Sequence, residues 1–278
     1  MSESTLLAFI HIEKTAGTAL NHYLSRSLLG YHPCLSFEFS EAEELDQNFL
    51  DAKELRQIHR YYPLLRGIGG HSLRSNAGYD DGPYIVNYFT FLRDPVLRVL
   101  SQFHYHREVM KIDWTFDNFL ASGNYNNLMC RRICGHASSE AAIHELQKRY
   151  YFVGLLEKFE ESMRHFRILS KKKGYSFKNV EVGARNVRAN RDDKRFIVSN
   201  EMTERVKAIN TEDKKLYEFV QQSGPAVNGT VSWGDVPSVD GPVMQYQMKD
   251  HVTGILNRVL SVAYCRRVEY LVRDMSKR

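Results

Sequence analysis

A polar stretch near the start of the chain, FIHIEKTAGTAL (Phe9–Leu20), combines residue types that bind an anion. An apolar run precedes the turn at Gly17, and a helical pattern of apolar residues follows it. A strand, a turn and a helix start leave backbone N–H groups pointing out of the positive end of the helix. Lys14 adds a positive charge, and Thr15 and Thr18 add hydroxyl groups. We therefore expect this turn to hold a phosphate or a similar anion.

The order of lysine and glycine argues against a nucleoside triphosphate with magnesium. The common triphosphate loop has the pattern G-x-x-x-x-G-K-[ST]. Here Lys14 comes before Gly17 and no earlier glycine is present, so the turn is too short to wrap a triphosphate. A single phosphate or a phosphosulfate fits better. The alternative is an ordinary strand–turn–helix with a threonine cap, which would explain the hydroxyl groups but not the lysine.

A second candidate phosphate site lies in TFLRDPVLRVLSQF, where Arg93 follows the strongest strand pattern of the chain, Tyr84–Leu92. We call the two candidate sites, each at the junction of a strand and a helix, the two corners. Asp94 is a typical N-cap residue, and Pro95 suits the first position of a helix. Ser101 lies eight residues after Arg93, about two helical turns further on. An arginine can bind a phosphate with two N–H groups, and a serine hydroxyl can complete the contact.

Strands and helices alternate along the chain, which predicts an α/β fold with a central parallel sheet flanked by helices. Ligands of such sheets bind at the carboxyl ends of the strands, where both candidate corners lie. The predicted strands are Leu6–Ile12, Leu64–His71, Tyr84–Leu92 and Tyr151–Leu156. The predicted helices include Glu41–Tyr62, Ser139–Arg149, Glu157–Lys173 and Asn200–Gln222, the last broken near Asn210.

Length and composition favour one globular domain over residues 1–278, with a surface loop at 223–241 and a C-terminal helical segment at 242–278. The net charge of +5 suits a pocket for an anionic ligand and is too small to argue for nucleic acid. No apolar run approaches the roughly 20 residues that span a bilayer. The start of the chain lacks the basic region and cleavage site of a secretory signal. We expect a cytoplasmic enzyme of bacterial type.

The four cysteines, Cys34, Cys130, Cys134 and Cys265, form no CxxC pair. We expect free thiols in a reducing cytosol. Cys130 and Cys134 are one helical turn apart, which indicates packing in the core and no metal clamp.

Two segments of the chain resemble the signature segments of sulfotransferases that use 3′-phosphoadenosine 5′-phosphosulfate (PAPS). These are FIHIEKTAGTAL and FLRDPVLRVLSQF, and the branch they resemble contains heparan and chondroitin O-sulfotransferases and bacterial homologues. Further segments match the family in the expected order: GGHSL, NLMCRRICG, YFVGLLEKFEESM and EDKKLYEFV. The resemblance covers about Leu6 to Val220. It implies a P-loop-like fold similar to that of nucleotide kinases.

The resemblance also implies roles for single residues. Arg93 and Ser101 would hold the 3′-phosphate of PAPS, and His71 would be the catalytic base. After the transfer, PAPS is left as 3′,5′-adenosine bisphosphate. The 5′-phosphosulfate would be held by Lys14, Thr15, Ala16, Gly17, Thr18 and Ala19. Two positions depart from the family pattern. Ala16 stands where glycine is frequent, and Glu13 stands where proline is usual, which puts a negative charge beside an anion site.

The chemistry needs few groups. Sulfuryl transfer resembles phosphoryl transfer, in which positioning and charge stabilisation supply most of the catalysis. Lys14 can neutralise the leaving phosphate oxygen, so no metal is required. The acceptor hydroxyl needs a base whose pKa is near neutral pH, and this requirement favours histidine. His71 follows two glycines at a predicted strand end. The alternative for His71 is a capping or core histidine.

Other basic residues have weaker assignments. His11 falls inside the first predicted strand and is expected to be packed. His104 and His106 have i, i+2 spacing, which places them on different helix faces and argues against a shared metal. The basic residues at 185–195 form either a solvated surface or a lid over the nucleotide or an acidic acceptor.

We therefore predict a PAPS-dependent O-sulfotransferase that acts on a hydroxyl acceptor, either a sugar, a polysaccharide or a small metabolite. Two alternatives are a catalytically inactive scaffold that binds adenosine bisphosphate and a P-loop kinase, which would require a divalent metal. A third, a nucleic-acid binder, would show a steep dependence on salt. We expect neither a nucleic-acid partner nor a membrane span, and the oligomeric state is open.

Overall fold

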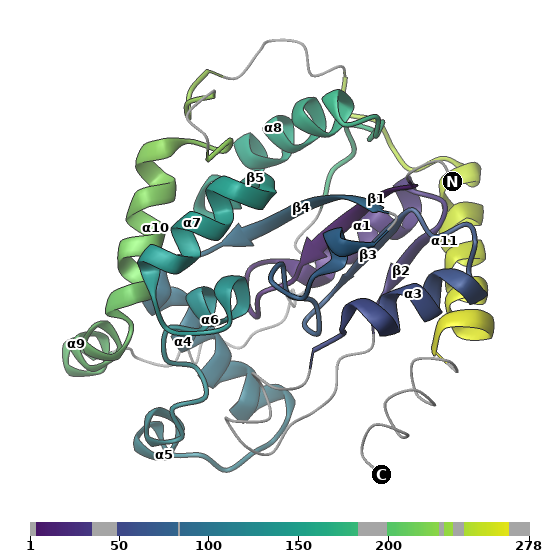
Figure 1. The fold of residues 1–278 in the computed structure, drawn as a ribbon. Helices are drawn as coiled ribbons and strands as arrows, with labels where there is room; N and C mark the ends of the chain where they lie inside the picture. Colours follow the sequence, from purple (N-terminus) through teal and green to yellow (C-terminus); the bar gives the residue numbers. More distant parts are fainter. Residues whose placement is uncertain are drawn as a thin grey trace.

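The computed structural model describes residues 4–34, 49–82, 84–182, 199–227, 231–235 and 242–266. Its centre is a five-stranded parallel sheet with the strand order β2-β3-β1-β4-β5 (Figure 1). The strands are β1 (Ser4–Ile10), β2 (Tyr31–Pro33), β3 (Gly67–Gly70), β4 (Tyr84–Leu92) and β5 (Tyr150–Leu155). The predicted α/β fold with a central parallel sheet flanked by helices is confirmed.

The helices of the described residues connect these strands and cover both faces of the sheet (Figure 1). They are α1 (Gly17–Ser27), α3 (Ala52–Tyr61), α4 (Pro95–His104), α5 (Phe116–Ala121), α6 (Leu128–Cys134), α7 (Ser139–Arg149), α8 (Phe159–Lys172), α9 (Asn200–Ile209), α10 (Thr211–Ser223) and α11 (Met248–Leu260). Among these helices, none combines the length and the apolar character needed to cross a bilayer.

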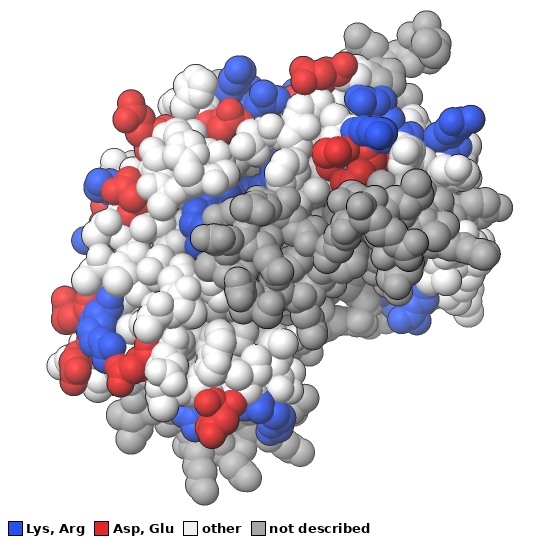
Figure 2. All heavy atoms as spheres, turned by 60° about the horizontal axis from the view of Figure 1, so that its bottom comes forward, with Lys and Arg blue, Asp and Glu red and all other residues white. Residues whose placement is uncertain are grey.

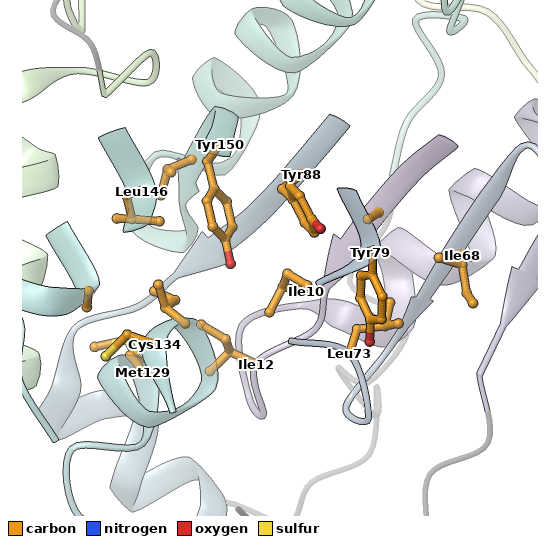
Figure 3. Packing of buried hydrophobic residues seen from close by; sticks show 14 of the residues in the cluster. Ile10, Ile12, Ile68, Leu73, Tyr79, Tyr88, Met129, Cys134, Leu146 and Tyr150 are labelled. Carbon is orange, nitrogen blue, oxygen red and sulfur yellow. The ribbon is translucent and has the colours of Figure 1, made fainter. Parts of the chain in front are cut away.

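Alternate residues of the strands face opposite sides of the sheet, and each side has its own core. On one side, Leu6, Ala8 and Ile10 of β1 pack with apolar residues of α3, α6, α7 and α10. Figure 3 shows this cluster, in which the rings of Tyr88 and Tyr150 lie on the same side of the sheet. On the other side, β1 residues pack against α1 and α8. Both layers hold β1 rigidly at the centre of the sheet.

A smaller cluster fixes the far end of α4. Val99 and Phe103 of α4 pack on Phe119 of α5 and Val206 of α9. The rings of Phe103 and Phe119 are 5.3 Å apart. Because this cluster lies outside the two cores of the sheet, it positions α4 independently of β4.

The predicted elements agree with the structure at several places. The strand Tyr84–Leu92 and the helix Ser139–Arg149 have the predicted bounds, and Asp94 caps α4 with Pro95 at its first position. The predicted break near Asn210 separates α9 from α10.

Other bounds were wrong. The helix predicted over Glu41–Tyr62 starts only at Ala52, because Asp51 and Glu54 form a capping box there, and residues 35–48 lie outside the described part. The first strand ends at Ile10, so His11 follows it and is not inside it. The short strand Tyr31–Pro33 was not predicted.

The C-terminal segment contains α11, followed by a π-helical turn, Ser261–Arg266. Asn257 of α11 joins it to the end of α1: its side-chain amide donates to Ser25 O and Leu28 O, both at 2.8 Å, and its oxygen accepts from Gly30 N. The basic loop at 185–195, residues 228–230 and 236–241 of the predicted loop at 223–241, and residues 267–278 lie outside the described residues.

Candidate functional site

The two predicted corners lie side by side in the sheet. β1 is hydrogen-bonded to β3 on one side and to β4 on the other. The chain leaves β1 toward β2 and leaves β4 toward β5, so the connections diverge between these neighbouring strands. Such a switch point opens a crevice at the carboxyl ends of the strands, which is where ligands bind in open α/β sheets.

The turn after β1 has an unusual backbone. Lys14 and Ala16 both adopt left-handed conformations, with φ of 67° and 68°. Thr15 between them is fully buried, and its hydroxyl donates to Ile12 O at 2.9 Å. The Thr15 hydroxyl therefore holds the turn closed in this structure. Alternating right- and left-handed residues turn successive N–H groups toward one point, which makes a concave anion site.

The helix that follows this turn begins without a protein cap. Ala16 occupies the N-cap position and offers no side-chain acceptor, and the first turn of α1 contains no acidic residue. Gly17 packs against the ring of His11, where a Cβ atom would lie 1.6 Å from His11 Nε2. Thr18 is exposed, and Ala19 is buried against the core. The positive end of α1 is therefore accessible to an anion.

Lys14 lies between the two corners. Its Nζ atom is 4.3 Å from the ring centroid of Tyr105, which begins a π-helical turn, Tyr105–Val109, after α4. Its carbonyl oxygen accepts a hydrogen bond of 3.3 Å from Arg93 Nη1. Ser101 precedes Tyr105 by four residues, so both lie on the helix face that approaches Lys14. The structure thus places Lys14 beside Arg93 and beside the turn that follows α4.

Arg93 projects from the end of β4 beside two carboxylates. Burial lowers the pKa of Arg93, while the charges of Glu157 and Asp94 raise it. The guanidinium stays charged at neutral pH, because the ordinary arginine pKa lies far above 7. Glu157 is engaged elsewhere: it accepts from Asp94 N at 3.0 Å and from Tyr217 Oη at 2.8 Å. Arg93 therefore carries a positive charge into the crevice.

His71 follows β3 and stacks on His11, with ring centroids 3.8 Å apart. Its Nδ1 atom lies 2.8 Å from the carbonyl oxygen of His11. A carbonyl can only accept, so the neutral ring carries its proton on Nδ1 and leaves Nε2 as the acceptor. Burial lowers the pKa of His71 below its ordinary value of 6.5, which keeps the ring neutral at pH 7.

Glu13, the unusual residue beside the anion site, is bound by an arginine from another element. Arg132 of α6 binds both of its oxygens, Nε to Oε2 at 3.0 Å and Nη2 to Oε1. Burial raises the pKa of Glu13, but the charge of Arg132, together with that of His71 where its ring is protonated at acid pH, outweighs burial and holds that pKa well below the ordinary range. The carboxylate is thus ionised and its charge is compensated. The sequence contains Arg132 but no local signal that pairs it with Glu13.

The other histidines are packed. His11 is buried, stacked between Phe9 and His71, and burial holds its pKa well below 6.5. His104 pairs with Glu108, whereas His106 stacks on Trp114 inside the small cluster around α4. The predicted separation of His104 and His106 is confirmed. Among the described residues, no group of three or more histidine, cysteine or acidic side chains has a metal-binding arrangement.

The three cysteines whose side chains are described are free and buried, as predicted. Cys130 and Cys134 lie on α6 and belong to the core cluster of Figure 3. The sulfur of Cys134 contacts the carbonyl oxygen of Cys130 at 3.3 Å, one turn earlier. Their role in packing is confirmed.

No protein-family model matches the chain, and no curated protein matches its sequence. Six chains of solved structures match, among them the two that follow. A sulfotransferase from Alicyclobacillus acidocaldarius aligns with a TM-score of 0.42 and 15% identity, over 77% of this chain and 94% of the other. Retinol dehydratase in complex with androsterone and the inactive cofactor PAP aligns with a TM-score of 0.33 and 14% identity, over 98% of this chain and 80% of the other. Both TM-scores are below 0.5, so neither similarity carries an argument about this chain.

The charges on the face shown in Figure 2 are mixed. Lysine and arginine side chains alternate with acidic ones over the described part of this face, and neither sign gathers into an extended patch. A nucleic-acid interface would require a continuous basic surface. The described part of this face shows no such continuous basic surface.

Proposed function

We propose that this chain is a PAPS-dependent sulfotransferase that transfers a sulfuryl group to a hydroxyl acceptor, with residues 1–278 forming one domain of the P-loop-like sulfotransferase type. One observation carries the proposal: an uncapped helix N-terminus, Lys14, Arg93 and His71 converge at the carboxyl ends of three neighbouring strands. The sequence resemblance assigns these same residues to the cofactor and to the base.

The residues present fit the two anionic ends of PAPS. The N–H groups of the left-handed turn and of α1, with Lys14 and Thr18, provide donors for the 5′-phosphosulfate. Ala16, Gly17 and Ala19 add no bulk that would block the approach. Arg93 and Ser101 provide a separate cation and a hydroxyl for the 3′-phosphate. A site with two separate anion positions suits a bisphosphate better than a triphosphate.

The proposed chemistry uses two side chains. When bound, PAPS supplies the sulfuryl group, whose bond to the phosphate oxygen breaks as its bond to the acceptor oxygen forms. His71 Nε2 takes the proton of the acceptor hydroxyl, which makes that oxygen a better nucleophile. Lys14 stabilises the negative charge that develops on the leaving phosphate oxygen. The acceptor belongs to the class of sugars, polysaccharides or small hydroxylated metabolites.

The proposed role of His71 predicts the direction of a pH dependence. Only the neutral ring can accept a proton, so kcat/KM falls when the pH drops through the pKa of His71. Burial lowers that pKa, and the acid limb of the profile is therefore expected below pH 6.5. A profile of kcat/KM against pH with any hydroxyl acceptor that supports turnover checks this. An acid limb above pH 7 would exclude His71 as the base.

A thermal-shift panel tests the cofactor site. The ligands are 3′,5′-adenosine bisphosphate and, separately, ATP and GTP with magnesium, and the proteins are wild type, Lys14→Ala and Arg93→Ala. A ligand at about 100 times its Kd adds about 2.7 kcal/mol of stability, which raises the midpoint visibly. We expect stabilisation by the bisphosphate in wild type and its loss in both variants. Lys171→Ala, which removes an exposed lysine at the end of α8, is the matched control.

The same panel distinguishes the alternatives. Stabilisation by ATP with magnesium and not by the bisphosphate would overturn the proposal in favour of a kinase. His71→Ala should keep the stabilisation by bisphosphate but lose sulfuryl transfer. If wild type binds the bisphosphate but transfers no sulfuryl group, so that His71→Ala has no activity to remove, the chain is a nucleotide-binding scaffold and not an enzyme of this type.

A further inference from the structure

Glu13 lies on the Nδ1 side of the His71 ring. Its Oε1 atom is 3.7 Å from His71 Nδ1, and both side chains are mostly buried, with 14% and 25% exposed. The same Nδ1 atom donates to His11 O at 2.8 Å. Two acceptors, a carbonyl and a carboxylate, therefore face the edge of the ring that is opposite the reactive Nε2. Both favour a proton on Nδ1.

Arg132 fixes the carboxylate in this place. Its guanidinium binds Glu13 with two N–H groups, and its side chain is only 2% exposed. α6, which carries Arg132, is anchored in turn: the buried carboxylate of Asp213 accepts from Met129 N at 3.0 Å and from Cys130 N at 2.9 Å. A bidentate pair on an anchored helix leaves the Glu13 carboxylate little freedom to turn away from His71.

The charges around His71 come from three directions and do not act alike. Arg132 from α6 and Arg74 from the turn after β3 both disfavour a proton on the ring, as does its burial. Arg74 Nη1 also donates to the carbonyl oxygen of His71 at 2.6 Å. The stacked ring of His11 is buried and neutral at pH 7. Among these groups, Glu13 supplies the negative charge that favours the protonated ring.

We propose that Glu13, clamped by Arg132, is a positioning residue for His71: it orients the ring through Nδ1 and strengthens Nε2 as a proton acceptor. This inference rests on the proposed role of His71 as the base. In the transfer, the O–H bond of the acceptor breaks and an N–H bond forms at Nε2, so the ring becomes positive. The Glu13 carboxylate stabilises that imidazolium, as a carboxylate does for the histidine of a catalytic triad.

The test is a histidine titration of the whole protein by NMR, with the His71 signals assigned through a His71→Gln variant. Glu13→Gln keeps the shape and removes the charge. We expect the titration midpoint of His71 to fall by about one pH unit, as is typical when an adjacent opposite charge is lost. Glu145→Gln is the matched control, because Glu145 also pairs with an arginine, Arg149 at 3.0 Å, and does not contact His71.

A double variant guards against misfolding. Glu13→Gln removes the ionised carboxylate that pairs with the buried Arg132, which is destabilising. Glu13→Gln/Arg132→Gln removes both charges, so the His71 midpoint should lie between those of wild type and the single variant. Nitrogen chemical shifts should also show a smaller share of the Nδ1–H tautomer in both variants. A double-variant midpoint at or below that of Glu13→Gln would overturn the inference.

Failure of this inference and failure of the proposed function give different results. If the His71 midpoint in Glu13→Gln equals that of wild type, Glu13 does not act on His71, whatever the enzyme does. If the midpoint shifts but wild type transfers no sulfuryl group, the contact is real and the proposed function is wrong. If both hold, the acid limb of kcat/KM moves to lower pH in Glu13→Gln by the same amount as the midpoint.

Discussion

The helices that follow β1 and β4 begin at the same edge of the sheet, but their first turns are satisfied in opposite ways. At α4, the Asp94 side chain accepts from Leu97 N at 2.9 Å, and Pro95 has no N–H group to satisfy. At α1, the N-cap is Ala16, and no acidic side chain lies in the first turn. At α4 the cap side chain thus engages a first-turn donor, whereas at α1 the cap residue engages none.

In the function proposed above, the two corners bind an anion by different means. At β1 the proposed binding group is the backbone, so the conformation of the turn matters more than any single side chain. At β4 the backbone only supports the side chains of Arg93 and Ser101. Substitutions that change backbone geometry should damage the first corner, and substitutions that remove a side chain should damage the second.

The largest effect is expected from Gly17→Ala. The added Cβ would lie 1.6 Å from His11 Nε2, in the ring that stacks on His71. Overpacking of this kind costs about 1–3 kcal/mol, and the turn must shift to relieve it. We expect stabilisation by 3′,5′-adenosine bisphosphate to be lost and the urea midpoint to fall. In the control Gly254→Ala, the new Cβ meets the flexible Arg26 side chain at 3.2 Å and the Ser25 carbonyl oxygen at an ordinary contact of 4.0 Å, and binding should be kept.

The next largest effect is expected from Arg93→Ala, which should weaken the binding of one phosphate and not of the other. A charge-assisted hydrogen bond contributes about 1.5–3 kcal/mol, so affinity for 3′,5′-adenosine bisphosphate should fall about 10- to 100-fold. Affinity for adenosine 5′-monophosphate, which lacks the 3′-phosphate, should change little. Isothermal titration with both nucleotides measures this difference. An equal loss for both nucleotides would place Arg93 at the 5′ end and contradict the assignment of the corners.

Asp94→Ala tests the capped helix alone. Loss of an N-cap side chain costs about 1 kcal/mol, so the free energy of unfolding measured with urea should fall by that amount. Binding of the bisphosphate should fall at most a few-fold, because the cap does not touch the proposed ligand. A loss of binding as large as that of Arg93→Ala would mean that the two corners are not distinct in the way described.

The smallest effect is expected from Ala16→Gly. A left-handed residue with a Cβ is strained by about 1–2 kcal/mol, whereas glycine adopts this conformation freely but loses more entropy on folding. The two terms nearly offset each other, so we expect a gain of about 0.5 kcal/mol in the free energy of unfolding. Urea denaturation checks the sign. A loss of stability would mean that the left-handed conformation of Ala16 is not a source of strain.

Local signals in the sequence predicted most of the fold. The strand Tyr84–Leu92 has no breaker, and Asp94 with Pro95 marks its end, so both bounds could be predicted. The strand Tyr31–Pro33 could not, because three residues with a proline carry no periodicity. It exists because it pairs with β3, which is a tertiary effect.

The candidate site divides in the same way. Lys14, Gly17 and Arg93 could be predicted because each stands at a recognisable strand end. The pair between Glu13 and Arg132 joins positions 119 residues apart, and the stack of His11 on His71 joins positions 60 residues apart. A single sequence contains no signal for such pairings, so the electrostatic surroundings of His71 could be known only from the structure.

The contact of Asn257 with the end of α1 has a consequence for how the chain folds. Asn257 accepts from Gly30 N across 227 residues, and α11 packs along α1, the helix that begins at the anion-binding turn. Contacts of such long range close late, because the entropy of a very large loop must be lost first. During synthesis, the face of α1 that packs on α11 is therefore covered only after the 227 residues that follow Gly30 up to Asn257 have been made.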